Sequence, residues 1–416
     1  MTRLLLPEVF GIMAIAMVVN TGLMMFSDLG LLQSIVRSKR GDDPRFLNTL
    51  WTIQILRGFA IWSVALIAAF MLANIQSTGW LGQVTAYAHP LLPYVIGTIG
   101  FSAVLQGFES TKIAVARRQL LLARVSQLEI GCNVVAVVTT VIWALIDRSI
   151  WALVGGWLVA AALKSALTHV IFPGVGNRLQ WEDSALNEAF NFGKWVFLSS
   201  ILTFLTASAD RLILSGLLSA QQLGIYSIAY LIANAVQQGS SKLSSYVAYP
   251  ALSEIARMRP EQFCKSYYRI RLPFDMLCLM LGGFLSAAGN GVVYILYDHR
   301  YADAGHILTT LSLTLIASRY IVADQAFLAL GKPKLLAIAN AFRMVTLYSM
   351  IPAGFFVAGL EGAIWGIVIA NLLTALITLY FSAKNGLFSL QTELLRLLAL
   401  PIGYIIGTGA QWVIGG

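Results

Sequence analysis

Residues 4–16, LLLPEVFGIMAIA, recur in residues 217–229, LLSAQQLGIYSIA, with six identical positions at an offset of 213. A second echo lies far from the first. Ala152, Leu153, Gly155 and Leu158 are matched by Ala363, Ile364, Gly366 and Ile369 at an offset of 211. Apolar helices share letters by chance, so each match alone is weak. Two matches at nearly the same offset indicate a duplicated helical bundle, and duplicated bundles in membranes are typical of transporters.

Composition places the chain in a membrane. Of its 416 residues, 58% are hydrophobic and only 11% are charged, whereas soluble domains carry about 25% charged residues. The net charge of +9 does not require a nucleic-acid partner, because Lys and Arg concentrate in the cytoplasmic loops of inner-membrane proteins. The three cysteines and four histidines are scattered, which excludes a disulfide framework and a metal site.

The hydrophobic segments predict an all-α polytopic protein with about twelve transmembrane helices. A span needs about 20 mostly apolar residues, and the sequence offers such segments at 8–30, 46–73, 86–109, 122–146, 151–172, 191–215, 219–248, 268–294, 304–328, 335–357, 361–384 and 393–413. We expect an N-terminal lobe over 1–172, a cytoplasmic linker over 173–190, a C-terminal lobe over 191–384 and an additional helix over 385–416.

The basic residues predict the orientation. One set of loops carries nearly all of them, and the other side offers little more than Arg3, Arg148 and Arg300. The basic side is therefore expected in the cytoplasm. The first span then runs from outside to inside, and the repeat likewise leaves no partner for the span at 191–215. We therefore expect the first helix of the N-terminal bundle to be absent. A start codon assigned too late is the leading explanation, and genuine truncation is the alternative.

With that helix restored, six spans separate matching positions of the two copies. An even number gives both halves the same topology, so the repeats are expected to be parallel, related by an axis along the membrane normal. Such an arrangement, a two-lobe bundle of six-helix repeats, places a central cavity between the lobes.

Ionisable residues inside spans are candidates for function, because they are costly there unless they face protein or water. Arg57, Arg319 and Arg211 are candidates to bind an anionic head group. A guanidinium can donate two parallel hydrogen bonds to a phosphate, and it stays charged when buried. The structural alternatives are ion pairs between helices and snorkelling side chains.

Four carboxylates are candidates for coupling transport to an ion. Asp28, Asp210, Asp324 and Glu129 could bind Na⁺ or relay protons, or pair locally with basic residues. Nothing in their spacing selects an ion, and no other cofactor is expected. The chain lacks a P-loop motif, so it is not expected to hydrolyse ATP.

Several stretches resemble a known family, in order along nearly the whole chain. Ser27-Asp-Leu-Gly30 resembles its N-terminal pattern, Ala209-Asp-Arg-Leu-Ile-Leu214 its middle, and Leu330-Gly-Lys-Pro-Lys334 its C-terminal half. The family is the polysaccharide flippase branch of the MOP superfamily, which includes O-antigen, exopolysaccharide and lipid II flippases beside the multidrug MATE transporters. Measured against this family, the chain is expected to lack helix 1.

The resemblance implies a two-lobe fold, usually of twelve to fourteen helices, with alternating access. It also implies transport of an undecaprenyl-pyrophosphate-linked oligosaccharide across the bacterial inner membrane for cell-surface polysaccharide biosynthesis and export. Membrane lipids and polysaccharide polymerase or export machinery would then be partners, and the family favours a monomer.

Two alternatives stay open at this point. A cation-coupled drug or metabolite exporter predicts an acidic cavity, whereas the deepest charged residues here are arginines. A membrane polymerase or glycosyltransferase predicts a large loop or a catalytic domain, and the connections between the expected spans are short. A transporter rather than an enzyme is therefore expected.

Overall fold

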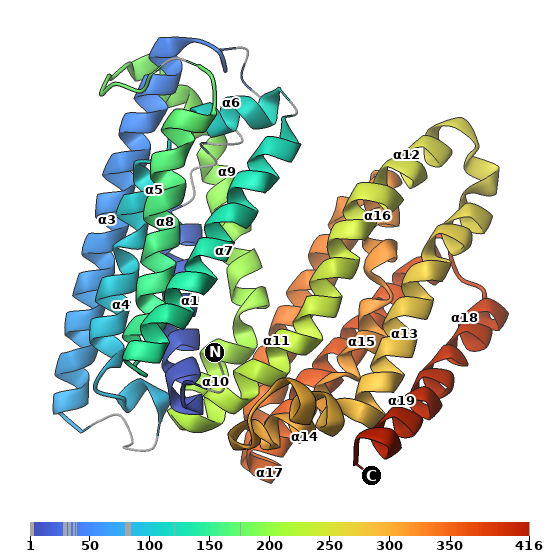
Figure 1. The fold of residues 1–416 in the computed structure, drawn as a ribbon. Helices are drawn as coiled ribbons and strands as arrows, with labels where there is room; N and C mark the ends of the chain where they lie inside the picture. The colour runs from blue at the N-terminus through green and yellow to red at the C-terminus, as the bar shows by residue number, and fades with distance from the viewer. Residues whose placement is uncertain are drawn as a thin grey trace. The chain divides into compact units, whose positions relative to one another are not determined.

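The computed structural model describes residues 4–27, 31, 35, 38, 40–79, 85–119, 121–174 and 176–415, with the side chains of 187–196, 198–199 and 413–415 left aside. Every regular element in this part of the chain is a helix (Figure 1). Each of the twelve segments expected to span a membrane is helical over most of its described length. Within the described residues, eight helices are long and apolar enough to cross a membrane. The chain is therefore an all-α, multi-span membrane protein, as predicted.

The chain divides into two compact units, Met1–Arg211 with Ser219–Gln221, and Leu212–Leu218 with Gln222–Gly416. The chain passes from unit 1 to unit 2 between residues 211 and 222, later than the linker expected over 173–190. The reason is visible in α9 (Asp183–Ala207), whose Phe204 stacks edge-on against Phe26 of α1 (Pro7–Phe26) at 5.0 Å between ring centroids. The lobe boundaries drawn from the sequence stay a prediction.

Unit 1 is a bundle built around a long helix that begins at a proline. Pro44 occupies the first position of α3 (Pro44–Ser77), and the Asp43 side chain caps it by accepting from the Arg45 backbone N–H at 3.0 Å, an arrangement that starts helices well. The other helices of unit 1 are α4 (Leu92–Gly100), α5 (Ser102–Gly107), α6 (Lys112–Arg118), α7 (Leu122–Ile146) and α8 (Trp151–Ile171).

Unit 2 is built around α13 (Phe263–Leu296), which packs along α19 (Ala399–Gly415) (Figure 1). Glycine makes this contact close: a Cβ on Gly403 would lie 2.2 Å from the carbonyl oxygen of Met280. Small residues let transmembrane helix backbones approach in this way. The remaining elements are α10 (Ala209–Ser215), which straddles the division, α11 (Ala220–Leu243), a π-helical turn (Ser244–Ala248), α12 (Tyr249–Met258), two 3-10 turns (Pro260–Gln262 and His299–Tyr301), α14 (Asp303–Leu311), α15 (Thr314–Ser318), α16 (Ile321–Ala329), α17 (Pro333–Lys384) and α18 (Leu390–Leu397).

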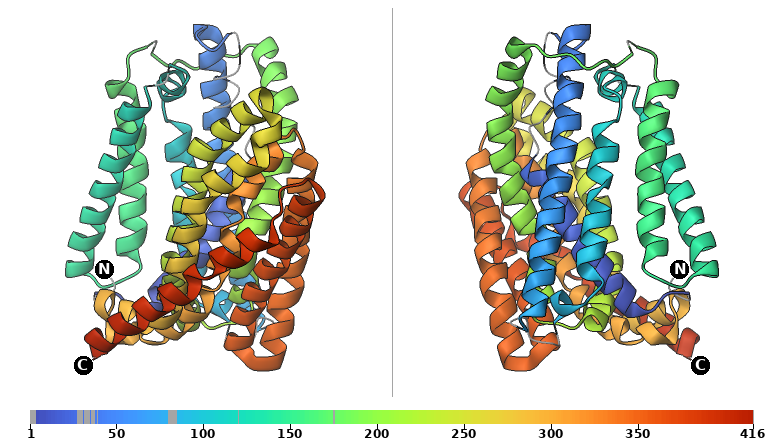
Figure 2. Two further views of the ribbon diagram at one scale, coloured as in Figure 1. Left: turned by 90° about the vertical axis from the view of Figure 1, so that its right-hand side faces the viewer. Right: turned by 90° about the vertical axis from the view of Figure 1, so that its left-hand side faces the viewer.

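The helix labelled α17 contains two of the expected spans. Its backbone leaves the helical region at Ala358 and Gly359, where Gly359 has a φ of 59°, a conformation that glycine adopts without steric cost. The two halves then run back side by side (Figure 2), in contact at Gly354 and Gly362. The spans expected at 335–357 and 361–384 are therefore separate helices joined by a tight turn.

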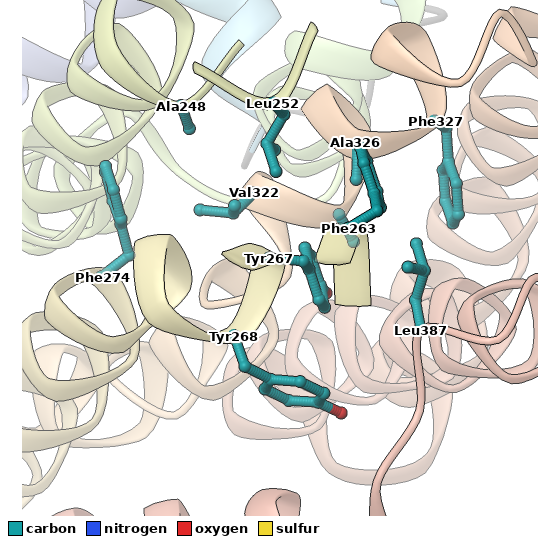
Figure 3. Close-up of a cluster of buried hydrophobic side chains, with 11 residues drawn as sticks. Ala248, Leu252, Phe263, Tyr267, Tyr268, Phe274, Val322, Ala326, Phe327 and Leu387 are labelled. Atoms are coloured by element: carbon teal, nitrogen blue, oxygen red, sulfur yellow. The ribbon is translucent and has the colours of Figure 1, made fainter. Parts of the chain in front are cut away.

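An apolar cluster fills the end of unit 2 where α12, α13 and α16 meet (Figure 3). Leu252, Phe263, Val322 and Phe327 belong to this core and are at most 5% exposed. Tyr267 lies among them, and Tyr268 lies at the lower edge of the view. The two tyrosine rings connect this apolar core to the charged residues described next.

Candidate functional site

Unit 2 buries five charged side chains in one connected group. They are Arg271 and Asp275 of α13, Arg319 at the junction of α15 and α16, and Glu393 and Arg396 of α18, and each is buried. We call these five residues the arginine–carboxylate cluster. Charged residues are almost never buried in this way unless they are paired.

Helix α13 contributes one ion pair along its own face. Arg271 and Asp275 are four residues apart and so lie on the same side of the helix, where Arg271 Nε donates to Asp275 Oδ1 at 3.0 Å. Arg271 Nη1 also donates to the Tyr267 hydroxyl at 3.1 Å. The Arg271 guanidinium carbon lies 4.5 Å from the centroid of the Tyr320 ring, within cation–π range. Arg271 is thereby held in one orientation.

Helix α18 contributes the other carboxylate and a third arginine. Glu393 and Arg396 are three residues apart and share the inward face, while Leu390, Leu394 and Leu395 are exposed. Arg396 Nη1 donates to Asp275 Oδ2 at 2.6 Å, and its Nη2 donates to the Tyr268 carbonyl oxygen at 2.6 Å. The hydrophobic face of this short helix thus points outward, and its charged face anchors it to α13.

Arg319 is 2% exposed and only partly satisfied. Its Nη2 donates to the Tyr320 hydroxyl at 2.9 Å and forms an ion pair with Glu393 Oε2. Its Nε and Nη1 are buried, and neither has a hydrogen-bond partner among the described residues. Buried N–H groups without partners are uncommon and destabilising. The ion pair between helices that we considered for Arg319 is therefore present, but it uses only one of the guanidinium nitrogens.

The cluster carries more positive than negative charge. Three guanidiniums face two carboxylates, and arginine remains protonated when buried. A buried excess of positive charge favours the binding of an anion, because the low dielectric of the interior strengthens that attraction. Guanidinium forks and tyrosine hydroxyls are well suited to phosphate and carboxylate oxygens.

A polar cavity of about 90 Å³ lies beside the cluster in unit 2. It has room for several water molecules or a small hydrated ion. Asp324 and Arg343 line it. The rest of its polar lining is Gln237, Ser318, Tyr320, Asn340, Asn371, Thr374 and Thr378.

In unit 1, Arg57 lies between two helices. Its Nε donates to the Ser27 hydroxyl at 3.1 Å and its Nη2 to the carbonyl oxygen of Met24 at 2.7 Å. These contacts are at the C-terminal end of α1, where a cation also interacts favourably with the helix dipole. Arg57 therefore joins α3 to the end of α1. Glu129, the candidate carboxylate of α7, pairs at 2.9 Å with Arg117, and both are partly exposed.

The remaining predicted residues lie near the division between the units. Asp210 is buried, and one of its oxygens lies 3.9 Å from Arg211 Nε. Arg211 Nη2 also donates to the Ala207 carbonyl oxygen at 3.2 Å, one helical turn earlier. Asp28 lies outside the described residues. Among the predicted residues, Arg319 belongs to the arginine–carboxylate cluster of unit 2 and Asp324 to the adjacent cavity.

A charged contact outside the spans joins the turn before α3 to the segment before α9. Arg40 Nη2 donates to Asp43 Oδ2 at 2.7 Å and to Glu182 Oε1 at 2.8 Å. The hydrogen bond from Arg40 holds the pKa of Asp43 below its usual range. A hydrogen bond from Ser184, followed by that from Arg40, lowers the pKa of Glu182. Both carboxylates are thus ionised at neutral pH, and the contact ties two loops of unit 1 together.

Comparison with known sequences places the chain in a family. The sequence model of the family described as "Polysaccharide biosynthesis protein" matches residues 1–305, more than half of the chain. The chain belongs to this family. It is 24% identical over 419 residues to an "uncharacterized membrane protein in cps region" of Klebsiella pneumoniae, covering 96% of this chain and 81% of that protein. It is 20% identical over 409 residues to the lipopolysaccharide biosynthesis protein WzxC of Escherichia coli, covering 96% and 79%.

Solved structures show the same fold. The lipid II flippase MurJ in an inward closed conformation superposes with a TM-score of 0.71 at 14% identity, covering 98% of this chain and 89% of that one. An inward-facing MATE transporter of the MOP superfamily superposes with a TM-score of 0.70 at 14% identity, covering 91% and 90%. The MOP/MATE-like fold and the resemblance to a polysaccharide-biosynthesis family, both predicted from the sequence, are confirmed.

Four residues of the cluster were absent from the predicted site. Arg271 and Arg396 lie near the ends of the spans expected at 268–294 and 393–413, on the side assigned to the basic loops, but both are in helices and buried. Glu393 lies at the very start of the span expected at 393–413. The available signal was helical spacing: Arg271 with Asp275 and Glu393 with Arg396 each place opposite charges on one helix face.

Proposed function

We propose that the chain is a flippase that moves an undecaprenyl-pyrophosphate-linked oligosaccharide across the bacterial inner membrane, for the biosynthesis and export of a cell-surface polysaccharide. The observation that carries the proposal is the family match over residues 1–305, together with a relative, WzxC, named for lipopolysaccharide biosynthesis. In the proposed mechanism, arginines hold the pyrophosphate, the sugars cross through a hydrated space, and the polyprenyl tail stays in lipid. Two lobes rocking about the site expose it alternately.

Arg319, Arg57 and Arg211 are proposed to contact the phosphate groups. Arg319 is supported by its buried Nε and Nη1, which have no partner among the described residues. Arg57 and Arg211 are each held by backbone carbonyl oxygens at helix ends, so contact with a phosphate group requires each to exchange these partners. A drug exporter for cations remains the second candidate because of the MATE-like fold, but the excess of buried arginine disfavours a cationic substrate.

Complementation of a flippase-null bacterial strain tests the proposal. Wild-type protein should restore surface polysaccharide, and the double variant Arg57→Ala with Arg319→Ala should reduce export at least tenfold at equal membrane abundance. Arg259→Ala is the matched control, because Arg259 is an exposed arginine of unit 2 and its loss should leave export unchanged. Unchanged export by the double variant would show that these arginines do not bind the substrate. Drug resistance on overexpression, without restored polysaccharide, would favour the exporter.

For coupling, we propose that Asp324 is the carboxylate that binds Na⁺ or a proton. Among the candidates that the structure describes, Glu129 and Asp210 form ion pairs with arginines. Asp324 instead lines the polar cavity, together with Arg343. Asp324→Asn should abolish the dependence of flipping on a Na⁺ or proton gradient in proteoliposomes, because the amide neither titrates nor supplies a full negative charge. Glu129→Gln should keep that dependence. Equal gradient dependence in wild type and Asp324→Asn would exclude Asp324 from coupling.

A further inference from the structure

The Glu393 carboxylate receives more hydrogen bonds than its two oxygens usually accept. Its Oε1 accepts from Arg271 Nη1 at 2.6 Å and from the Tyr268 hydroxyl at 3.1 Å. Its Oε2 accepts from Arg271 Nη2 at 3.1 Å, from the Tyr320 hydroxyl at 3.2 Å and from Arg319 Nη2. A carboxylate offers about four lone-pair directions, so five donors crowd it.

Further donors at the same place are unused. Arg319 Nε and Nη1 are buried without partners among the described residues, although Nη2 of the same guanidinium reaches Glu393. The cluster also carries one more guanidinium than carboxylate. The donors around Glu393 therefore fit a group with more acceptor oxygens and more negative charge than a carboxylate. Phosphate has both, since a phosphate group presents three acceptor oxygens and about two negative charges at neutral pH.

We propose that Arg271 and Arg319, with Tyr268 and Tyr320, form a binding site for a phosphate-class anion, and that Glu393 of α18 occupies this site in the absence of that anion. Glu393 is then an internal competitor. It keeps the arginines paired until a phosphate group displaces it, and α18 moves as it leaves. That the phosphate belongs to a lipid carrier rests on the function proposed above; the site itself rests on the cluster geometry.

Several features of helix α18 suit a helix that moves away from the arginine–carboxylate cluster and returns to it. It has eight residues, and its inward anchors are Glu393 and Arg396. Its outward leucines suit a lipid environment, so displacement into the membrane exposes little new apolar surface to water. Before the helix, Gly386 has a φ of 71°, and a Cβ there would meet nothing within 4 Å, which leaves the backbone room to turn. In the proposed displacement, α18 pivots at this glycine.

Anion binding to the full-length protein in phosphatidylcholine nanodiscs tests the site, with inorganic pyrophosphate as the probe and calorimetry as the measurement. Wild type should bind weakly, because Glu393 competes from within the same chain. Glu393→Gln keeps the side-chain size but removes the charge, and should bind at least tenfold more tightly. Adding Arg319→Gln to that variant should remove the gain. Equal affinity of wild type and Glu393→Gln, or a gain that survives Arg319→Gln, would overturn the proposal.

Asp275→Asn is the matched control within the cluster. Asp275 is a buried carboxylate that contacts Arg271 and Arg396, so the variant also raises the net positive charge. Glu393 still occupies the site, however, and the gain in affinity should stay below threefold. A gain as large as that of Glu393→Gln would attribute the effect to charge alone and reject the competition by Glu393.

A second measurement does not depend on the folding of a cluster variant. A spin label is attached to Gln391→Cys, at an exposed position of α18. The protein that carries it keeps an unchanged cluster, and its three native cysteines are replaced by alanine. Pyrophosphate should increase the mobility of the label as Glu393 is displaced. An unchanged spectrum at saturating probe would contradict the displacement of α18.

Farnesyl pyrophosphate in the same assays distinguishes the source of the phosphate. Binding of this lipid probe at least tenfold tighter than pyrophosphate assigns the site to a lipid-borne phosphate, and equal binding of the two assigns it to phosphate alone.

Because anion binding is measured independently of polysaccharide export, the proposed site and the proposed flippase function can be refuted separately. A site that binds pyrophosphate in a chain that restores no polysaccharide would refute only the flippase function. Restored export with no effect of Glu393→Gln on binding would refute only this site.

Discussion

At the scale of single residues, Arg271 joins the two carboxylates of the arginine–carboxylate cluster. It contacts both carboxylates, Asp275 at 3.0 Å and Glu393 at 2.6 Å, and it is 1% exposed. Removing one partner of a buried ion pair leaves the other charge uncompensated, which is strongly destabilising, whereas surface ion pairs contribute little. The stability of unit 2 should therefore depend on this arginine far more than on its exposed neighbours.

Arg271→Met should lower the thermal stability of the purified protein by about 3–5 kcal/mol. Methionine keeps much of the volume but leaves Asp275 and Glu393 with fewer donors. Arg269→Met is the control, since Arg269 is exposed on the same helix two residues earlier and should change stability by less than about 0.5 kcal/mol. Unfolding followed by intrinsic fluorescence in detergent measures both. Equal unfolding temperatures for the two variants would contradict a structural role for the cluster.

The predictability of the site at this scale was uneven. Arg319 was identified because an arginine deep in an apolar segment is costly wherever its partner lies. Its partner Glu393 was missed because the two are 74 positions apart in sequence, and no local pattern connects them. Arg271 was hidden by the rule that basic residues near span ends belong to loops, a rule that describes topology and not burial.

At the scale of helices, packing distances are set by glycine where two backbones meet. On α19, a Cβ at Gly403 would lie 2.2 Å from the Met280 carbonyl oxygen, whereas a Cβ at Gly409 would meet nothing within 4 Å. The two positions are in the same helix, so they share the same intrinsic preference of alanine over glycine. They differ only in their contact with α13.

Gly403→Ala should separate α19 from α13 and destabilise the protein by about 1–3 kcal/mol, the usual effect of overpacking. Gly409→Ala should be neutral or slightly stabilising. Thermal unfolding of both variants, with protease susceptibility of the C-terminal helix as a second readout, distinguishes them. A Gly403→Ala protein as stable as wild type would show that α19 is not held closely against α13.

The helices themselves were predictable because about 20 apolar residues can satisfy their backbone in a membrane only as a helix. The breaks within these helices were not predictable. The segment expected as one span at 304–328 is divided into α14, α15 and α16, and Arg319 lies at one of these breaks. Hydropathy averages over such breaks, and no proline marks this one, so the sequence offered no local signal for the helix break at Arg319.

At the scale of the whole chain, the repeat and the charge asymmetry make one joint prediction. In unit 2, the turn between α12 and α13 and the turn between α16 and α17 lie at one end, opposite the α13–α14 connection (Figure 1). The first end carries the exposed Arg259, and the opposite end carries His299, whose side chain is 87% exposed. In unit 1, Arg148 lies in the short connection between α7 and α8 and is exposed.

Parallel repeats require Arg148 and His299 to face the same side of the membrane, and the positive-inside rule places Arg259 opposite both. In a Cys264→Ser background, where the two other cysteines are buried, Arg148→Cys and His299→Cys should react with an impermeant maleimide in intact cells. Arg259→Cys should react only after permeabilisation. Reversed labelling of all three variants would show that the protein has the opposite orientation in the membrane. Labelling of Arg148→Cys and His299→Cys from opposite sides of the membrane would be more consequential, because it would show that the two sequence repeats have inverted topology. The proposal of alternating access between parallel lobes would then have no support.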